Sequence, residues 1–389
     1  MPVDTPHIEH AYRKPDWAKI RAFAEGARAV RAAGETYLPR LKGQSDDEYA
    51  SYKMRAEVYG AIDRTIDGLD GAIFLKPPKL ELPAGSEPEA IANDVDLAGR
   101  TLTEWIRQEV REILTTARRG VLIDHTPTGA ANQRPYLVSY PAERIVNWES
   151  ETIDGAETLT MVALEEFVQV PMAGDPFVRT PMRRFRVLRL VDQVYHVEMW
   201  TQKTKADIPT SGPTTSQMPR QGESFEKTED VVPLRRGAPL DRIPFFFLGA
   251  SGQSVCPEKP PLLDVVELCH QHYMAAADYA HGLHWVGLPT PWVTGARDKD
   301  NMKIGPSSAI VLEDPEAKVG MLEFTGTGLG ALKERLADLE RKMAILGARL
   351  LEEQKREAEA AETVKLRQGG DISTLGSISD AVSRAVESV

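Results

Sequence analysis

The residues whose spacing comes nearest to a ligand-binding motif form the glycine turn Gly326-Thr327-Gly328-Leu329-Gly330, between a predicted strand and a predicted helix. A dinucleotide-binding turn has the spacing GxGxxG inside a βαβ unit, whereas this turn reads GxGxG and no βαβ unit surrounds it. The sequence also lacks the phosphate-binding pattern GxxxxGK followed by Ser or Thr. We therefore predict a flexible strand-to-helix turn. A nucleotide-dependent enzyme is the alternative, which equilibrium binding of labelled nucleotide would test.

Potential metal ligands gather in a second stretch, which contains Cys269, His270, His272, His281 and His284. If this stretch is helical, His270 and His272 point about 200° apart, and the last two histidines lie about three turns away. The spacing matches neither HExxH nor paired CxxC. We expect structural histidines on a surface between helices or between subunits.

Two further motifs are incomplete. Asp298-Lys299-Asp300-Asn301 resembles the start of a calcium loop, but Ala309 occupies the position of the bidentate carboxylate. Gly249-Ala250-Ser251-Gly252 is not the GxSxG of a nucleophile turn, because its second glycine comes one residue early. The sequence therefore predicts no catalytic residue, no metal ion and no cofactor, and the chain is expected not to be an enzyme.

Composition limits the possible partners. The chain has 389 residues, 42% of them hydrophobic and 27% charged, and a net charge of −11. A sequence-specific DNA-binding protein usually carries a basic patch, so this balance argues against one, although not against a protein along which nucleic acid slides. The two cysteines show no CxxC spacing, which fits a reducing compartment. No signal peptide is expected, because the N-terminus Met1-Pro2-Val3-Asp4 lacks the charged and apolar regions of one. No membrane-spanning segment is expected either, because no apolar run approaches about 18 residues.

The N-terminal third is expected to be helical. Residues 15–75 carry apolar side chains at helical spacing, and Ser45 with Glu48 three residues later forms a capping box. A third helix is predicted over 94–118, with Leu97 and Trp105 on its buried face. From Gly120 the apolar period changes to two, which predicts an antiparallel sheet.

The predicted strands of this sheet include 158–170, 184–191 and 193–200. Residues 203–232 are polar and have few bulky apolar side chains, so a mobile loop or an extended hairpin is expected there. The expected fold class is therefore α+β.

The C-terminal part reads as a long helix, a small strand-and-turn unit and a second long helix. The first helix covers 261–286, the unit 290–324, and the second helix follows the glycine turn. Its apolar residues repeat at alternating spacings of three and four, which predicts one narrow stripe facing a partner helix. This stripe, called the seam below, comprises Leu329, Leu332, Leu336, Leu339, Met343, Leu346 and Leu350.

The chain resembles a tailed-bacteriophage portal protein. The resemblance is to the branch long filed as a domain of unknown function among phage head proteins. Five short stretches, in order along about 330 residues, carry the resemblance. They are 34–39, Tyr140 with 142–148, 243–246, 322–326 and 343–351.

The resemblance implies a portal-type fold with a helical and antiparallel-β wing, a two-helix stem, a small α/β clip between the stem helices, and a long helix towards a crown. The implied divisions are a wing over 1–260 (helical over 15–118, strand-rich over 119–250, mobile loop over 203–232), stem helices over 261–287 and 325–350, a clip over 288–324, a tunnel-loop region over 351–363 and a wing-to-crown helix over 364–389.

Portals are rings of about twelve subunits around a channel, and a head-to-tail contact that closes on itself gives such a ring. The implied partners are other copies of the chain, double-stranded DNA passing without sequence preference, the large terminase subunit, a head-completion or tail adaptor protein, and the major capsid protein with its scaffold. The implied location is the portal vertex of the virion, after assembly in the host cytoplasm. No membrane is involved.

The candidate sites follow from this resemblance. The seam would pack against stem helices of the same or the adjacent subunit. Candidate residues at the DNA channel are Glu352, Glu353, Lys355 and Arg356. Candidate residues for docking the packaging motor on the clip are Trp292, Arg297, Asp298, Lys299, Asp300 and Lys303. The alternative is a cytosolic coiled-coil scaffold that uses the seam for dimerisation, but it leaves the strand-rich middle and the insert unexplained.

Overall fold

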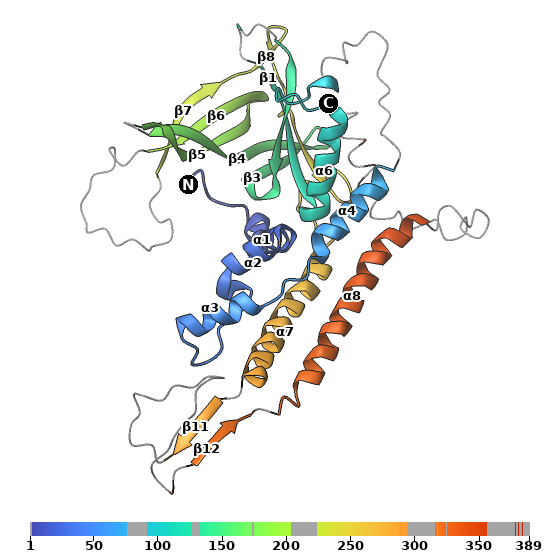
Figure 1. Cartoon of the computed structure of the whole chain (residues 1–389). Helices are drawn as coiled ribbons and strands as arrows, with labels where there is room; N and C mark the ends of the chain where they lie inside the picture. The colour runs from blue at the N-terminus through green and yellow to red at the C-terminus, as the bar shows by residue number, and fades with distance from the viewer. Residues whose placement is uncertain are drawn as a thin grey trace, which may run out of the picture. The chain divides into compact units, whose positions relative to one another are not determined.

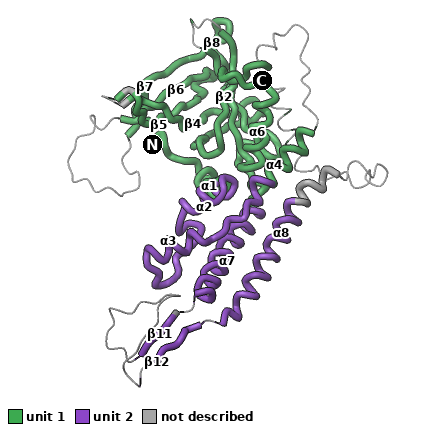
Figure 2. Tube along the Cα trace, viewed as in Figure 1, with its two compact units in different colours: residues 1–21, 65–263, 350–389 green, residues 22–64, 264–349 purple. Residues whose placement is uncertain are grey.

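A computed structural model describes residues 2–75, 92–126, 133–172, 175–203, 224–288, 290–294, 318–323 and 325–355, with residues 129, 316, 378, 380 and 383. The described chain combines helices with antiparallel sheets, which confirms the α+β class (Figure 1). It divides into two compact units, 1–21 with 65–263 and 350–389, and 22–64 with 264–349 (Figure 2).

Five α-helices of the N-terminal third are described. They are α1 (Ile8–Glu25), α2 (Ala27–Ala32), α3 (Asp46–Arg55), α4 (Ala61–Ile73) and α6 (Leu102–Thr116), with a 3-10 turn at Gly34–Thr36. The predicted capping box starts α3: Ser45 accepts a hydrogen bond from the Glu48 backbone N–H, and the Glu48 carboxylate accepts one from that of Ser45. Helix α1 begins earlier than predicted and contains Pro15.

The helix predicted over 94–118 is wrong in its first two turns. Asp96 accepts hydrogen bonds from the backbone N–H groups of Ala98 and Arg100, which folds this stretch into a loop. Leu97, predicted to be buried, has φ 64° and is 44% exposed. The helix starts only after Thr101, whose side chain caps α6 together with Glu104. Local side-chain to backbone hydrogen bonds thus outcompete helix formation.

Two larger antiparallel sheets and the two-stranded sheet β8-β9 occupy the middle of the chain. The order β10-β1-β2 forms a three-stranded sheet and β3-β4-β5-β6-β7 a five-stranded meander. The two sheets share an apolar core that includes Leu122, Trp148, Leu164, Phe245 and Phe247. The strands are β1 (Arg118–His125), β2 (Pro135–Pro141), β3 (Ile145–Ile153), β4 (Ala156–Met172), β5 (Asp175–Val191), β6 (Val194–Gln202), β7 (Phe225–Val231), β8 (Leu234–Arg235), β9 (Ala238–Pro239) and β10 (Phe245–Gly249), with a 3-10 turn at Ala142–Arg144.

Strands β4 and β5 continue beyond their neighbours in the sheet. Strand β3 pairs with β4 only up to Leu164 of β4. Strand β6 pairs with β5 only from Arg184 of β5 onward. Among the described strands, residues 165–172 and 175–183 therefore pair only with each other. We call this ribbon the β4–β5 arm; its Phe177 is 94% exposed.

The polar segment 203–232 is not a loop throughout. Its end forms strand β7, which pairs with β6 from Gln202↔Phe225 to Val197↔Val231. The side chains of β7 are mostly exposed, so the strand is held by ladder hydrogen bonds at the sheet edge and its sequence carries no strong apolar signal. The remainder, 204–223, lies outside the described residues.

The C-terminal elements are α7 (Leu263–Gly287), β11 (Thr290–Thr294), β12 (Lys318–Leu322) and α8 (Leu329–Lys355), of which residues 264–349 belong to the second unit. Strands β11 and β12 pair antiparallel from Thr290↔Leu322 to Thr294↔Lys318. The two long helices and the two strands between them lie where the sequence pattern predicts them. Within the predicted strand-and-turn unit 290–324, residues 295–315 lie outside the described residues.

Candidate functional site

Helices α7 and α8 form an antiparallel pair. At one end Cys269 Sγ lies 3.2 Å from Met343 Sδ, in the middle Gln271 accepts a hydrogen bond from Arg335, and at the other end Leu329 lies against Gly282. A Cβ atom at Gly282 would come within 2.7 Å of Leu329 Cδ2. The glycine thus lets the two helices approach closely where they lead into the β11–β12 hairpin (Figure 1).

The seam faces α7 with part of its surface. Leu339 is 0% exposed and Met343 2%, while Leu329, Leu332, Leu336 and Leu346 are only half-buried. Leu350 belongs to α8. In-chain packing therefore covers the centre of the seam and leaves apolar area along the rest of it. The role of the seam in packing between subunits stays a prediction.

Two histidines of α7 have structural partners within the second unit. The Nε2 atom of His270 lies 2.9 Å from the Tyr37 carbonyl oxygen, and that of His272 lies 3.3 Å from Glu340 Oε1. Both contacts agree with the predicted structural role between helices. In the part of the chain that the structure describes, no cluster of three or more His, Cys, Asp or Glu side chains is placed to hold a metal ion.

The glycine turn leads from β12 into α8. Gly326 has φ 61°, a value that favours glycine, and its carbonyl accepts the hydrogen bond from the Leu329 backbone N–H. A Cβ at Gly326 would lie 3.0 Å from Val286 Cγ2. The turn is thus fixed by close packing on the end of α7, which accounts for the glycine at position 326.

The β11–β12 hairpin carries one of the predicted docking residues. Trp292 is 42% exposed, and its indole covers Gly320 so closely that a Cβ there would lie 2.7 Å from Cζ2. The other five candidates, Arg297, Asp298, Lys299, Asp300 and Lys303, lie outside the described residues. Docking at this hairpin stays a prediction.

Of the predicted channel residues, Glu352, Glu353 and Lys355 belong to α8, and Arg356 lies outside the described residues. Helix α8 continues to Lys355, into the predicted tunnel-loop region 351–363, and the role of that region stays a prediction. Glu, Gln and Lys are good helix formers, so the end of the apolar stripe at Leu350 does not end the helix. Contact with DNA stays a prediction.

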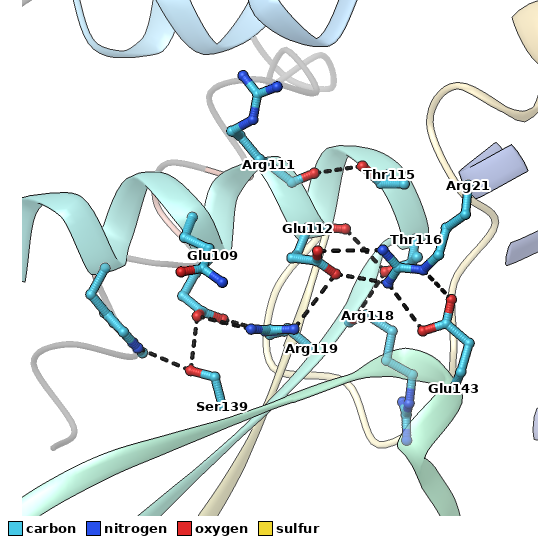
Figure 3. A network of polar contacts seen from close by, with 12 residues as sticks. Arg21, Glu109, Arg111, Glu112, Thr115, Thr116, Arg118, Arg119, Ser139 and Glu143 are labelled. Atoms are coloured by element: carbon cyan, nitrogen blue, oxygen red, sulfur yellow. Dashed lines mark hydrogen bonds and ion pairs between the residues drawn. The ribbon is translucent and has the colours of Figure 1, made fainter. Parts of the chain in front are cut away.

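A buried polar network in the first unit has no counterpart in the sequence predictions (Figure 3). Arg119 Nε lies 2.7 Å from Glu109 Oε2, and both side chains are almost fully buried. The Ser139 hydroxyl donates to Glu109 Oε1 at 2.8 Å and accepts from the Trp105 indole N–H at 2.9 Å. Burial raises the pKa of the Glu109 carboxyl, while Arg119 and Ser139 act in the opposite direction.

Arg21 connects the same network to α1. It forms ion pairs with Glu112, at 2.8 Å, and with Glu143. Arg119 also lies 3.5 Å from Glu112. Helix α1, helix α6 and the turn before β3 are thus tied together by alternating charges.

A second buried arginine is held by aromatic rings. The guanidinium carbon of Arg118 lies 4.2 Å from the ring centroids of both Trp148 and Phe247, and Nη1 donates to the Val255 carbonyl at 2.9 Å. Burial lowers the pKa of Arg118 to about 9. The group is therefore charged at neutral pH, and the two ring faces stabilise that charge.

These elements define an α+β protein whose C-terminal part is a helix, a β-hairpin and a helix. Residues 261–389 match the family described as "Domain of unknown function (DUF4055)". This match covers α7, β11, β12 and α8, and it confirms the predicted resemblance to a family filed as a domain of unknown function.

Solved structures add two weak likenesses. A chain of the "Virion of native gene transfer agent (GTA) particle" has a TM-score of 0.34 and 11% identity, over 82% of this chain and 72% of that chain. A chain of the "Neck of empty GTA particle computed with C6 symmetry" has a TM-score of 0.35 and 10% identity, over 86% of this chain and 74% of that chain. No curated protein matches. Among the described residues, the structure contains no helix long and apolar enough to cross a membrane.

Proposed function

We propose that this chain is a structural protein of the head–tail junction of a tailed-phage-like particle, and more specifically its portal protein. The observation that carries the proposal is the antiparallel α7–α8 pair with the β11–β12 hairpin at its end, inside the segment that matches DUF4055. In a portal, two such helices form the stem and the insert between them forms the clip. The proposal makes the chain a non-enzymatic structural component.

The seam supports a neighbour beyond α7. Leu332, Leu336 and Leu346 remain half-buried after in-chain packing. A stripe that one helix only partly covers can be completed by a second helix from another copy. Repeated head to tail, such a contact closes a ring of about twelve subunits. The rival scaffold would use the same seam for dimers, although Leu339 and Met343 are already buried within the chain.

The net charge of −11 supports a channel along which DNA moves without sticking. Repulsion of the phosphate backbone by Glu352 and Glu353 keeps binding weak, while Lys355 and Arg356 make transient contacts. The clip would dock the large terminase subunit during packaging and a tail adaptor afterwards. The wing would contact the major capsid protein and its scaffold at the portal vertex.

The experiment that tests the proposal is the particle mass of the purified full chain, by light scattering with negative-stain imaging. A portal gives a ring with a central hole and a mass about twelve times the 43.0 kDa of one chain. A dimer or tetramer at micromolar concentration would contradict it and favour the scaffold.

Two variants of α8 test the seam within the same experiment. Leu336→Asp places a charge on the half-buried seam and should dissociate the ring while circular dichroism stays unchanged. Lys333→Asp changes an exposed position of the same helix and should leave the ring intact. If both variants assemble equally, the seam is not the contact between subunits.

Two further variants test the finer roles. Charge reversal at Lys355 and Arg356 should slow DNA packaging in a reconstituted reaction, and normal packaging would exclude a DNA contact there. Deletion of 297–303 should abolish binding of the terminase while the ring persists, and retained binding would exclude this part of the clip as the docking surface.

A further inference from the structure

A polar pocket in the second unit lies between the loop before α3, the end of α3 and the last turns of α7. It is lined by Lys42, Asp47, Glu48, Arg55, His281, His284 and Trp285, among others. The pocket contains two titratable histidines that neither the packing of the seam nor the proposed channel uses. Their hydrogen bonds fix their protonation state.

Each of these histidines accepts a hydrogen bond from a group that can only donate. The Trp285 indole N–H donates to His281 Nε2 at 3.0 Å, and Arg55 Nη2 lies 3.3 Å from His284 Nε2. An indole and a guanidinium have no acceptor atom, so both Nε2 atoms must be unprotonated. Both rings are therefore neutral in this arrangement.

Protonation of either ring removes its bond. At His281 a new Nε2–H would point at the indole N–H, and the Nδ1 atom is already buried without a hydrogen-bond partner. At His284 the new N–H would face the Arg55 guanidinium. Two or three positive charges would then lie together at the junction of α3 and α7, where like charges repel.

The other charges around His281 do not offset this effect fully. Asp278 and Glu48 favour its protonation, but Asp278 accepts the Tyr52 hydroxyl at 2.6 Å and Glu48 is engaged in the capping box with Ser45. Asp47 and Lys42 line the same pocket with opposite charges. Burial is the largest cause that lowers the pKa of His281, and the positive charges of Arg55 and His284 lower it further.

We propose that His281 and His284 form a pH-sensitive latch, which holds the end of α3 on the last turns of α7 at neutral pH and releases it as the pH falls towards about 5. The latch lies next to the α7–β11 connection, because Trp285 is two residues before the end of α7. The latch requires neither ring formation nor DNA.

The direction follows from linkage. A histidine that must be neutral in the folded arrangement binds fewer protons there than when it is released, so the arrangement is stable above the free imidazole pKa and weakens below it. His281, whose pKa is lowered, contributes up to about tenfold per pH unit. The transition is expected between about pH 6.5 and 5.

The test is hydrogen exchange of the full chain at pH 7 and pH 5, with each rate divided by the intrinsic rate at that pH. Protection of peptides covering 46–60 and 278–288 should fall at least about tenfold in the wild type. In the double variant His281→Gln/His284→Gln, the amide oxygens accept the same bonds without titrating, and the fall should be less than about threefold. His196→Gln, in the other unit, should behave as the wild type.

A second readout separates the latch from general acid loosening. The difference in tryptophan fluorescence between wild type and Trp285→Phe should change between pH 7 and 5, and that change should vanish in the double glutamine background. Equal loss of protection in wild type and double variant, or none in the wild type, would overturn the proposal.

Discussion

Replacement of Arg119 by Met is the sharpest test of the buried network in Figure 3. Arg119 is 6% exposed and its partner Glu109 0% exposed. Removal of one member of a buried ion pair leaves the other charge without compensation, which costs about 3–5 kcal/mol. Ser139 still donates to Glu109, so we expect the lower part of this range, about 3 kcal/mol.

The assay is urea unfolding, followed by tryptophan fluorescence, of Arg119→Met, Glu109→Gln and the double variant. In the double variant the buried charge is gone, while the amide oxygen introduced by Glu109→Gln would still accept the Ser139 hydroxyl. We expect it to recover about 2 kcal/mol relative to Arg119→Met, because a neutral buried amide costs less than an unpaired carboxylate. The matched control is Arg28→Met, whose ion pair with Glu25 is exposed and should change stability by less than about 1 kcal/mol.

The pH dependence adds an independent check. Without Arg119, the pKa of Glu109, which burial already raises, rises further. A carboxyl whose pKa is raised in the folded state binds more protons in the folded than in the unfolded chain. The loss of unfolding free energy in Arg119→Met therefore shrinks as the pH falls from 7 to 5, by up to about 1.4 kcal/mol per pH unit. If Arg119→Met lost less than about 1 kcal/mol of unfolding free energy, or lost more as the pH falls, Glu109 would not be an uncompensated buried charge in the variant.

Three further predictions concern packing and titration. Gly120→Ala places a Cβ against the Phe245 ring and should destabilise by about 1–3 kcal/mol, whereas Gly68→Ala, in open space on α4, should stabilise by about 0.5–1 kcal/mol; denaturant midpoints measure both. Leu339→Ala should lower the free energy of unfolding by about 2–5 kcal/mol, because the side chain is fully buried. Equal urea midpoints for this variant and the wild type would contradict this. Burial lowers the pKa of His10, so stability should fall as the pH drops below about 6.5, and His10→Gln should weaken that slope in thermal unfolding at pH 7 and 5.

The main elements could be predicted because their signals are local. The period of apolar residues indicates α7 and α8, and a capping box indicates the start of α3. The start of α6 was missed because Asp96 forms a loop through hydrogen bonds to its own neighbours. For strand β7 the sequence leaves a mobile loop and an extended hairpin as alternatives, because its side chains are exposed and its stability comes from the ladder with β6.

The buried charge network has a signal in the sequence. Glu109 lies at helical spacing with Trp105 and Ile113, so a carboxylate falls on the apolar face of α6. A charged residue at such a position requires a buried partner, and Arg119 is one candidate close in sequence. No such signal identifies the helix on which the seam packs. A heptad stripe indicates that a helix packs against another helix, but it does not indicate which one.

The β4–β5 arm has a consequence for solubility. Among the described strands, this two-stranded ribbon has no partner on either edge. Open strand edges are a template for further strands, and exposed apolar side chains such as Phe177 add to this tendency. Pro171 lies in one strand of the ribbon and Pro181 in the other, and a proline offers no N–H to an incoming strand. Arg179, opposite Pro171, places a charge on the same stretch. The arm can therefore project beyond the sheet while its edges resist uncontrolled strand addition between copies.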